Sequence, residues 1–525
     1  MIKKLVIVLI GLILILALFI WYGFSTPTKD LADVEVTSAS KPVLFLLIDS
    51  LMDEPLQNAI DEGSVPALEF LAENGQYLPE IVSSYPTMSV TIDSTLLTGT
   101  YTNQHQVPAL AWFHKEEDRL VNYGSSAMEI YKLGVEQVLH DTIFNLNQQH
   151  LSKDTSTIFE ELDNRGDDSA SINGMLYRGN SQHNFHVPKV ISLFNLLPDT
   201  IDVKGPTILT LGRLSQFSSE NNKHNNVWQS LGMNDNFAGN EIRNLIQNDT
   251  LPSFTLAYFP ELDKPVHEKG PMTLDGLEQV DQVLQTILNE FPSWEEALEQ
   301  ITFIVYGDSG QAKIGDIEQE ALVDLKILSE IYNIPKLGDP IQKDDQIVLA
   351  VNSRMAYINL LDENIPYEEI ISHFIKDPRI GFIAWKDDAG NHVVSASSED
   401  PFTFQPDGEY SDQYGQRWTL DGDFSVLDLY VDEQKNISYW DYPDALARLY
   451  GALHSHQGRY LIVDTKPGYE FIGEHSPTHV GGGGHGSLHK DDSLTPLIIA
   501  GADTVPEYNR VIDFKDWILE LTKNQ

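Results

Sequence analysis

An aspartate and a histidine, Asp263 and His267, lie four residues apart in the segment 263–271. The segment follows residues 254–259, an apolar run that predicts a buried strand. Pro265 favours a rigid loop over a helix for this pair. Carboxylate oxygens and imidazole nitrogens both bind divalent cations such as zinc or manganese. Aspartate and histidine also share surface loops by chance, so the pair indicates a metal site only together with further ligands.

Other candidate ligands stand near the ends of further apolar runs. The runs 43–48 and 302–306 are soon followed by Asp49 and Asp308, and His485 comes directly after a run of glycines. Unbroken apolar runs between helical stretches predict a parallel sheet that is buried on both faces. In such sheets ligands bind at the carboxyl ends of the strands, where these aspartates would lie. A single aspartate there would more often be a helix cap or a turn former, whereas several together favour a metal centre.

Thr87 offers a hydroxyl nucleophile. It precedes a helix predicted over residues 90–97 and closed by Thr98 and Gly99. Free backbone N–H groups and the helix dipole favour an anion at such an N-terminus. Without metal ligands nearby, Thr87 would be an ordinary helix cap; with them, it is a candidate for attack on phosphorus.

These motifs resemble, in the same order, those of the alkaline phosphatase superfamily, and especially its type I phosphodiesterase and nucleotide pyrophosphatase branch. Each short motif is unspecific, but their occurrence together in the family's order makes the resemblance strong. It implies an α/β fold with an alkaline-phosphatase-like central, mostly parallel sheet flanked by helices. The matching positions are Asp49, Pro86-Thr87, Thr98-Gly99, residues 263–271, residues 307–310 and His485-Gly486.

The resemblance implies a site for two divalent metal ions, with zinc expected first. Asp263, His267 and His485 would hold one ion. Asp49, Asp308 and the Thr87 oxygen would hold the second. A pair of cations stabilises both the entering and the leaving oxygen of an in-line displacement at phosphorus. Thr87 would attack and form a phosphorylated enzyme, which water would then hydrolyse.

Two positions depart from the family pattern. Ser309 stands where the family has a histidine, and a hydroxyl is a poorer ligand, so the second site would be weaker or prefer manganese or magnesium. Gln311 is near enough in sequence to compensate. Nucleotide-cleaving members also carry an asparagine soon after the Thr-Gly pair. By spacing, this chain has Ala109 or Leu110 there, with Asn103 a little early, so nucleotide specificity is not implied.

The N-terminus carries a predicted membrane anchor over residues 1–24. Lys3 and Lys4 precede 20 uncharged residues, 5–24, which as a helix would span about 30 Å, the thickness of a bilayer's hydrocarbon core. The lysines should stay cytoplasmic, which places the rest of the chain outside the cell. A cleaved secretory signal is the alternative, although no small-x-small cleavage site follows. The chain has no cysteine, which excludes disulfides, thiolate ligands and attachment of a lipid to cysteine.

The chain is strongly acidic. It has 34 basic and 78 acidic residues, and a net charge of −44. Such a surface repels polyanions, which argues against a binder of duplex nucleic acid, and attracts cations.

The pattern of elements predicts one domain with an insertion. A polar tether over residues 25–40 would lead into a catalytic α/β domain. In the insertion, strands at 355–360 and 381–385 would flank a helix at 367–375, and residues 387–391 would form a hairpin turn. The chain would then return to the first domain through a helix at 444–454 and a strand at 460–463. The expected segments are 41–320 for the first part of the catalytic domain, 321–440 for an α+β cap insertion and 441–525 for its second part.

Together these features predict a membrane-anchored extracellular phosphodiesterase or phosphoryl hydrolase acting on a small phosphoester or lipid-headgroup substrate. A transferase that moves phosphorus-containing headgroups between envelope lipids or polymers is one alternative, suggested by the anchor. A non-catalytic binding protein with a degenerate second metal site is another, suggested by Ser309.

Overall fold

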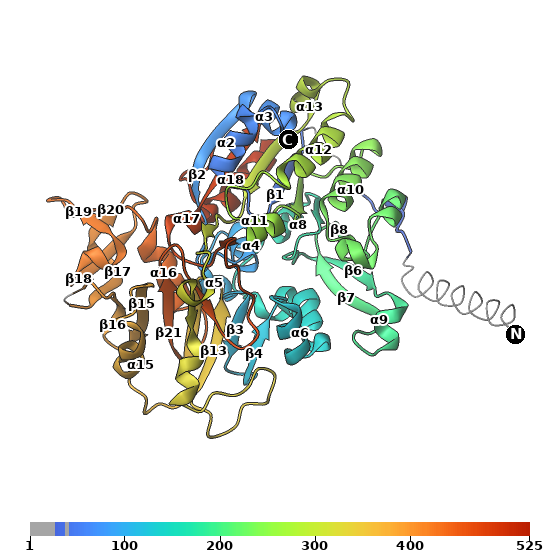
Figure 1. Cartoon of the computed structure of the whole chain (residues 1–525). Coiled ribbons are helices and arrows are strands. Elements are labelled where there is room, and N and C mark those ends of the chain that lie inside the picture. Colours follow the sequence, from blue (N-terminus) through green and yellow to red (C-terminus); the bar gives the residue numbers. More distant parts are fainter. Residues whose placement is uncertain (1–26, 37–40, 399, 525) are drawn as a thin grey trace, which may run out of the picture.

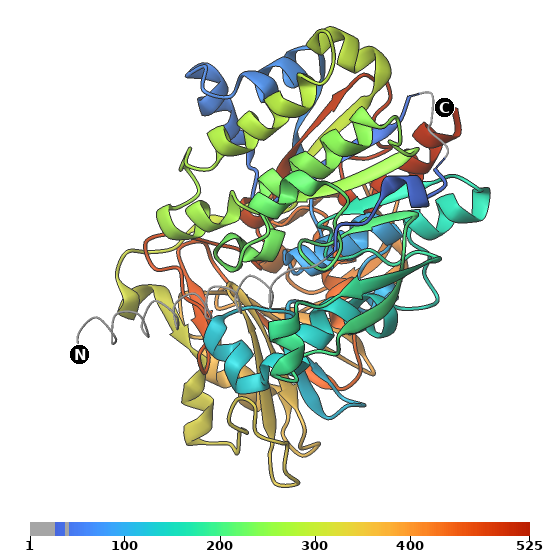
Figure 2. The same ribbon diagram turned by 90° about the vertical axis from the view of Figure 1, so that its right-hand side faces the viewer.

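The computed structural model describes residues 27–36, 41–398 and 400–524. Within these residues the two largest sheets have seven and nine strands, and they form the upper and lower parts of the molecule (Figures 1 and 2). No helix of the described part is long and apolar enough to cross a bilayer. The membrane span predicted at residues 5–24 lies outside the described residues. Part of the predicted tether packs on the body of the protein, where the Lys29 N–H donates to the carbonyl of Gln216 at 2.9 Å.

The seven-stranded sheet has the order β2-β24-β10-β1-β9-β5-β8. Its strands β10, β1, β9, β5 and β8 are parallel, and only β24 among the described strands of this sheet runs against its neighbours. The predicted mostly parallel central sheet is therefore confirmed. The strands are β1 (Val43–Ile48), β2 (Gly75–Val82), β5 (Ser169–Ile172), β8 (Ile208–Thr210), β9 (Phe254–Phe259), β10 (Thr302–Gly307) and β24 (Leu494–Ala500).

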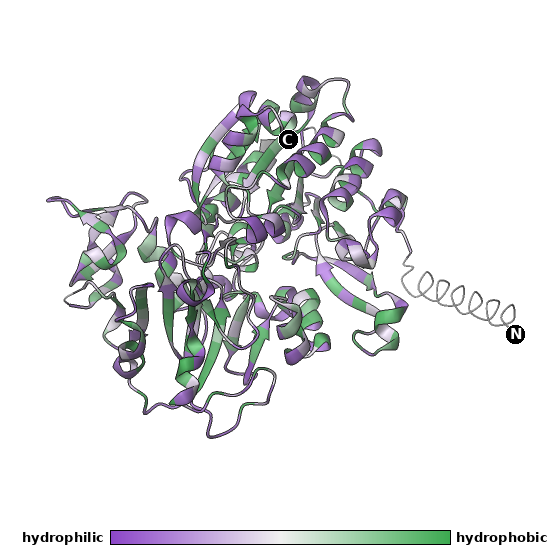
Figure 3. Cartoon of the chain, in the orientation of Figure 1, coloured by the Kyte–Doolittle hydropathy of each residue, from purple (hydrophilic) through white to green (hydrophobic). Residues whose placement is uncertain are grey.

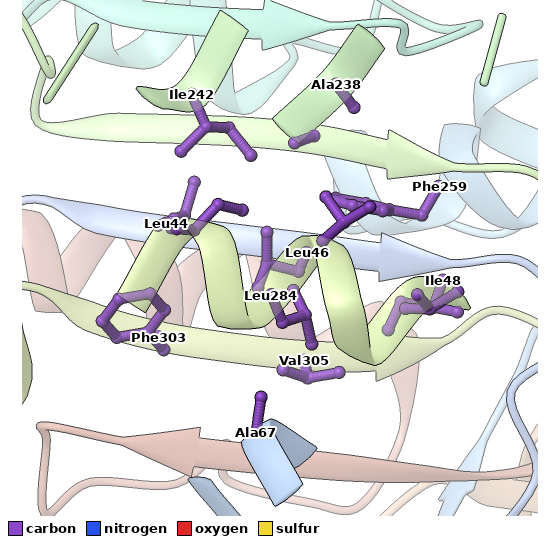
Figure 4. Close-up of a cluster of buried hydrophobic side chains, with 14 of the residues drawn as sticks. Leu44, Leu46, Ile48, Ala67, Ala238, Ile242, Phe259, Leu284, Phe303 and Val305 are labelled. Carbon is purple, nitrogen blue, oxygen red and sulfur yellow. The ribbon is translucent and has the colours of Figure 1, made fainter. Parts of the chain in front are cut away.

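Every residue of β1 is buried, because helices cover both faces of this sheet. Leu44, Leu46 and Ile48 point to one face, where Figure 4 shows them against Leu284 and Ile242 of covering helices. The alternate residues of β1 belong to the core of the opposite face. The first face is covered by α2 (Asp53–Asp61), α3 (Pro66–Glu73), α10 (Asp235–Gln247), α12 (Leu277–Leu288) and α13 (Trp294–Gln300), and the second by α4 (Ser89–Thr98), α8 (Ile158–Arg165) and α18 (Phe514–Leu521).

The nine-stranded sheet lies at the lower left of Figure 1 and is largely antiparallel. The helix α15 (Tyr367–Phe374) contributes to the core on one face and α16 (Ala445–Leu453) to the core on the other. Apolar residues therefore lie along the strands, while the peripheral helices carry many hydrophilic residues (Figure 3). The strands are β13 (Ile347–Asn352), β14 (Met355–Leu360), β15 (Ile380–Asp387), β16 (Gly390–Val394), β17 (Phe402–Asp412), β18 (Arg417–Asp421), β19 (Leu429–Val431), β20 (Asn436–Tyr439) and β21 (Arg459–Thr465).

One strand lies elsewhere than the sequence suggested. The run 460–463 was expected to rejoin the first domain, but it forms β21, which lies between β14 and β15 in the nine-stranded sheet. The expected boundary at residue 441 is wrong for this strand. An apolar run indicates that a strand is buried, but not which sheet it joins. The hairpin turn predicted at 387–391 is present, since Asp387 pairs with Gly390.

Candidate active site

The register of three parallel strands brings the candidate ligands to one edge of the first sheet. Ile48, the last residue of β1, pairs with Phe259 at the end of β9 and with Gly307 at the end of β10. The loops that carry Asp49, Asp263 and Asp308 therefore start side by side, although the residues are far apart in sequence. This edge is the carboxyl end of the sheet, as expected for an open α/β protein.

Asp263, His267 and His485 form a compact group of possible metal ligands. Their ligand atoms all lie within 4.8 Å of one another, and His267 Nε2 is 3.1 Å from Asp263 Oδ1. The rigid loop predicted for the first two is instead a short helix, α11 (Asp263–Lys269). Pro265 is tolerated because it stands in the first turn, where its missing N–H would have no partner. A spacing of four residues then places both side chains on one helix face.

Both imidazoles are held by their Nδ1 atoms. His267 Nδ1 lies 2.8 Å from the carbonyl of Gly483, and His485 Nδ1 contacts the carbonyl of Thr87. A carbonyl can only accept, so Nδ1 carries a proton in both rings, which leaves Nε2 as the ring atom that would bind a cation. Gly482 allows this arrangement, because a Cβ at that position would collide with the carbonyl of His267.

Asp49 and Asp308 lie beside this group and are linked to it by Ser50. The backbone N–H of Ser50 donates to Asp308 Oδ1 at 2.9 Å, and its hydroxyl donates to Asp263 Oδ1 at 2.9 Å. Asp49 is 6% exposed and accepts a hydrogen bond from the hydroxyl of Tyr258. The three carboxylates of the two predicted ion sites are thus held in one hydrogen-bonded network through Ser50.

The charges of these groups change one another's pKa values. Burial raises the pKa of the Asp49 carboxyl well above its usual range, and the charges of Asp308 and Asp263 raise it further. Burial also raises the pKa of Asp308, to about 6. Burial would raise the pKa of Asp263 too, but His267 outweighs it and holds this pKa low. Burial lowers the pKa of His485 to about 4, so the imidazole is neutral at pH 7, the form that binds cations.

Thr87 is fully buried and lies two residues before α4. Its Oγ1 accepts a hydrogen bond from the backbone N–H of Gly486 at 2.7 Å. A fixed N–H at this position stabilises negative charge on the threonine oxygen. The Thr87 carbonyl contacts His485, so the candidate nucleophile and a candidate ligand hold each other in place. Helix α4 ends at Gly99 in the left-handed conformation, close to the predicted end.

Ser309 replaces the family histidine, and Gln311 was considered near enough in sequence to compensate for its loss. The structure gives the surroundings of both residues. Ser309 is fully buried, and its hydroxyl has no hydrogen-bond partner among the described residues. The Gln311 amide nitrogen donates to Ser50 Oγ at 2.7 Å and to Asp263 Oδ1 at 2.9 Å. The Gln311 amide nitrogen therefore supports the first group of ligands, while its Oε1 is buried without a hydrogen-bond partner among the described residues.

Two residues near the site were missed by sequence reasoning. Asp93 is 3% exposed within α4, and its charge raises the pKa of Asp49. The signal available for it was a charged residue inside an otherwise apolar and hydroxyl-rich helix. His479, which follows Glu470 in a loop, stacks on His267 at 4.1 Å between ring centroids and is hydrogen-bonded to the buried Glu470.

The residues present fit a cation at the first place, where three ligand atoms lie close together, and buried oxygens without partners indicate the second. Buried oxygens of Asp93, Asp308, Ser309 and Gln311 lack hydrogen-bond partners within the described part of the chain, and a buried oxygen without a partner is costly unless a donor or cation meets it. A second group of possible ligands, His114, Glu117 and His150, lies outside this site.

Residues 43–374 match the model of the family described as type I phosphodiesterase/nucleotide pyrophosphatase. The match covers more than half of the chain, and the chain belongs to this family. It is accordingly a hydrolase of phosphoester bonds, and members of the family generally depend on two metal ions. No curated protein sequence matches the chain significantly.

Solved structures of related enzymes share the fold. Murine ectonucleotide pyrophosphatase/phosphodiesterase 5 has 13% sequence identity over 92% of this chain and 95% of that chain, with a TM-score of 0.54. An inactive variant of the murine enzyme in complex with AMP has a TM-score of 0.55 at the same identity and coverage. Phosphonoacetate hydrolase from Sinorhizobium meliloti 1021, in complex with phosphonoformate, has 12% identity over 95% of this chain and 100% of that chain, with a TM-score of 0.52.

Proposed function

We propose that this chain is a metal-dependent phosphodiesterase that uses Thr87 as its nucleophile and acts on a small phosphoester. The observation that carries the proposal is the buried Thr87 hydroxyl, held by the Gly486 N–H and tied through its own carbonyl to His485. The complex of a structural neighbour with AMP suggests a substrate of this size. We further propose that residues 5–24 anchor the chain in the cell membrane with the catalytic part outside.

Asp263, His267 and His485 would hold one divalent cation, and Asp49, Asp308 and the Thr87 oxygen would contribute to a second. When bound, the two cations would supply positive charge against the oxygens of the phosphoryl group. Zinc suits the first set because it contains two imidazoles. The buried carboxylates of the second set suit a harder ion such as manganese or magnesium.

The reaction would consist of two displacements at phosphorus, and residues of this chain have a role in each. Thr87 Oγ loses its proton to water and attacks phosphorus, the new O–P bond forms as the bond to the leaving alkoxide breaks, and the alkoxide takes a proton from water. The Gly486 N–H stabilises the negative charge on Thr87 Oγ before attack. Water then displaces Thr87 from phosphorus and restores the hydroxyl. Ser50 keeps Asp308 and Asp263 aligned through both displacements.

Removal of metal ions by a chelator is expected to abolish the hydrolysis of bis(p-nitrophenyl) phosphate by the full-length chain in detergent. His267→Ala should weaken the first site because one of its two imidazoles is lost. The checks are metal content by mass spectrometry and release of nitrophenol, before and after chelation.

The results of this experiment also distinguish the proposed hydrolase from a binding protein and from a transferase. Activity that survives complete metal removal would contradict a metal-dependent site. One tightly held cation without turnover would instead favour a binding protein with a degenerate second site. A product formed with an added alcohol, in place of water, would favour a transferase.

A further inference from the structure

Three possible metal ligands meet at the turn of a hairpin, apart from the candidate active site. Glu117 Oε1 is 3.8 Å from Nε2 of His114 and 3.8 Å from Nε2 of His150, and the ligand atoms of the three residues all lie within 4.8 Å of one another. The residues come from a hairpin and from a π-helix that follows it in the chain. His114 ends β3 (Ala111–His114), Glu117 stands in the turn before β4 (Arg119–Asn122), and His150 ends η2 (Asp141–His150).

The buried histidine of this group has a ring nitrogen without a partner. His150 is 6% exposed, and among the described residues its Nε2 has no hydrogen-bond partner. Its other nitrogen, Nδ1, lies 2.8 Å from the hydroxyl of Tyr123. The 3.8 Å from Nε2 to Glu117 is too long for a hydrogen bond. A buried polar atom in this state is unfavourable unless a donor, an acceptor or a cation meets it, so Nε2 is available to a cation on the side of Glu117.

The charges around Glu117 favour a cation at the same place. Arg119 Nε donates to Glu117 Oε2 at 2.7 Å, and Oε1 is the oxygen nearest to both histidines. Arg119 also donates two hydrogen bonds to the buried Asp141, at 2.6 and 2.9 Å. One guanidinium thus faces two carboxylates, and a net negative charge remains beside two imidazoles. Two imidazole nitrogens and one carboxylate oxygen are a ligand set that binds zinc in proteins.

A cavity of about 310 Å³ adjoins this group, and His114 and His150 are part of its lining. Lys115 and Glu116 also line the cavity, with opposite charges. Zinc held by three protein ligands keeps a fourth position for water. The cavity is large enough to hold that water.

We propose that His114, Glu117 and His150 bind a zinc ion that ties the hairpin to the end of η2. At zinc–ligand distances of about 2.1 Å, neighbouring ligand atoms of a tetrahedral site lie about 3.4 Å apart, slightly closer than Glu117 Oε1 now stands to each histidine. Glu117 is exposed and His114 half-buried, so rotation of these two side chains can bring the ligand atoms to zinc while the buried His150 stays in place. Two imidazoles favour zinc over magnesium or calcium.

Binding costs one weak hydrogen bond. The Glu117 N–H donates to His114 Nδ1 at 3.2 Å in an exposed turn. An imidazole that binds zinc through Nε2 carries its proton on Nδ1, so this hydrogen bond is lost. Water can accept from an exposed N–H, which keeps the cost small. The His114 ring keeps its contact with Trp112, at 4.9 Å between ring centroids.

The test counts bound zinc and does not depend on turnover. The full-length chain in detergent is stripped with a chelator, incubated with zinc chloride, passed through a desalting column and analysed by mass spectrometry for zinc. His150→Gln protein should hold one zinc ion fewer than wild type, whatever number the candidate active site holds. His392→Gln is the matched control and should hold as much zinc as wild type. His392 also lies 2.8 Å from a carboxylate, that of Asp387, and stacks on Trp385, but it belongs to no group of three close ligand atoms in the described part of the chain.

Zinc affinity gives a second measurement. It is determined by titration against a chromophoric chelator in a His267→Ala background, which weakens the candidate active site. His150→Gln should lower the affinity by more than about 100-fold, because even loss of a hydrogen bond to a metal ligand costs about 10–100-fold. Tyr123→Phe removes such a bond to His150 Nδ1 and should cost about 10–100-fold. Glu117→Gln removes the only charged ligand of the proposed set and should cost at least about 10-fold.

Zinc should also slow hydrogen exchange in the hairpin. Its other end is already fixed beside β13 (Figure 1), because the backbone of Ala111 forms two hydrogen bonds with the Asn352 side chain, both at 2.9 Å. The turn 115–118 is the end that zinc would hold. Its amides should exchange more slowly with zinc in wild type, and zinc should have no such effect in His150→Gln protein.

Equal zinc content and affinity in wild type and His150→Gln protein would overturn the proposed site. An equal loss of zinc in His392→Gln protein would also overturn it, because zinc would then bind to partly exposed histidines in general. If His150→Gln protein does not fold, the exposed Glu117 decides, and unchanged zinc affinity in Glu117→Gln protein would contradict the proposal. The site is independent of the chemistry proposed for Thr87, and metal counts made in His150→Gln protein exclude this zinc ion.

Discussion

Thr87→Ala is expected to lower the turnover of bis(p-nitrophenyl) phosphate by about 10³–10⁶-fold, the usual range for loss of a nucleophile. The substitution removes the attacking oxygen and the acceptor of the Gly486 N–H. The measurement is the rate of nitrophenol release at saturating substrate, with metal content determined on the same protein. Acid quenching during turnover should trap a phosphorylated peptide that contains Thr87 in wild type.

Two controls separate chemistry from folding. Thr87→Ser keeps a hydroxyl and should retain part of the activity together with the trapped phosphopeptide. Thr91→Ala removes another buried threonine hydroxyl, one that donates to the carbonyl of Val107, and should leave turnover close to wild type. Wild-type turnover in Thr87→Ala protein would rule out the covalent route, and activation of water at the same site would replace it.

Arg354→Met is expected to cost about 3–5 kcal/mol of stability, because it leaves a buried carboxylate without its partner. Arg354 and Asp492 are both fully buried and form an ion pair. Arg354 lies between β13 and β14, and its backbone N–H donates to the carbonyl of His485 at 3.0 Å. Asp492 accepts a hydrogen bond from Ser487 N at 2.8 Å. The pair therefore connects the nine-stranded sheet to the loop that carries a candidate metal ligand.

The expected result is a lower midpoint of thermal and urea unfolding, together with weaker zinc binding, because the loop of His485 loses its support. Lys189→Met serves as a control, since it breaks an exposed ion pair with Asp199 and should hardly move the midpoint. The double variant Arg354→Met/Asp492→Leu should recover part of the loss, because no unpaired charge remains buried. An unchanged midpoint in Arg354→Met would show that solvent or another group replaces the guanidinium.

Local patterns in the sequence were sufficient for several elements of the fold. The apolar run 43–48 is β1 with every residue buried, because only a strand covered on both faces tolerates such a run. Helix α8 begins at the capping residue Thr157 and ends at Gly166, both readable from residue type. The family's motifs also marked Asp49, Thr87 and Asp308 as candidates, because each follows or precedes a recognisable element end.

Other features depend on contacts between distant segments. Pro265 was expected to exclude a helix, yet α11 forms around it, since a first-turn position needs no N–H donor. The run at β21 joined the nine-stranded sheet because both β14 and β15 offered it backbone partners. His479 belongs beside the site only because the chain returns to stack it on His267.

The sequence by itself determined which residues are candidates for the chemistry, because metal ligands and nucleophiles are limited to a few side-chain types. It also determined which runs are buried, because burial follows hydropathy. Only the tertiary structure decided which of these groups meet. The parallel register of β1, β9 and β10 joins Asp49, Asp263 and Asp308 at one edge, and the packing of α4 brings Asp93 near enough for its charge to raise the pKa of Asp49. Such contacts between distant residues depend on strand order and helix packing over hundreds of residues, which no local pattern encodes.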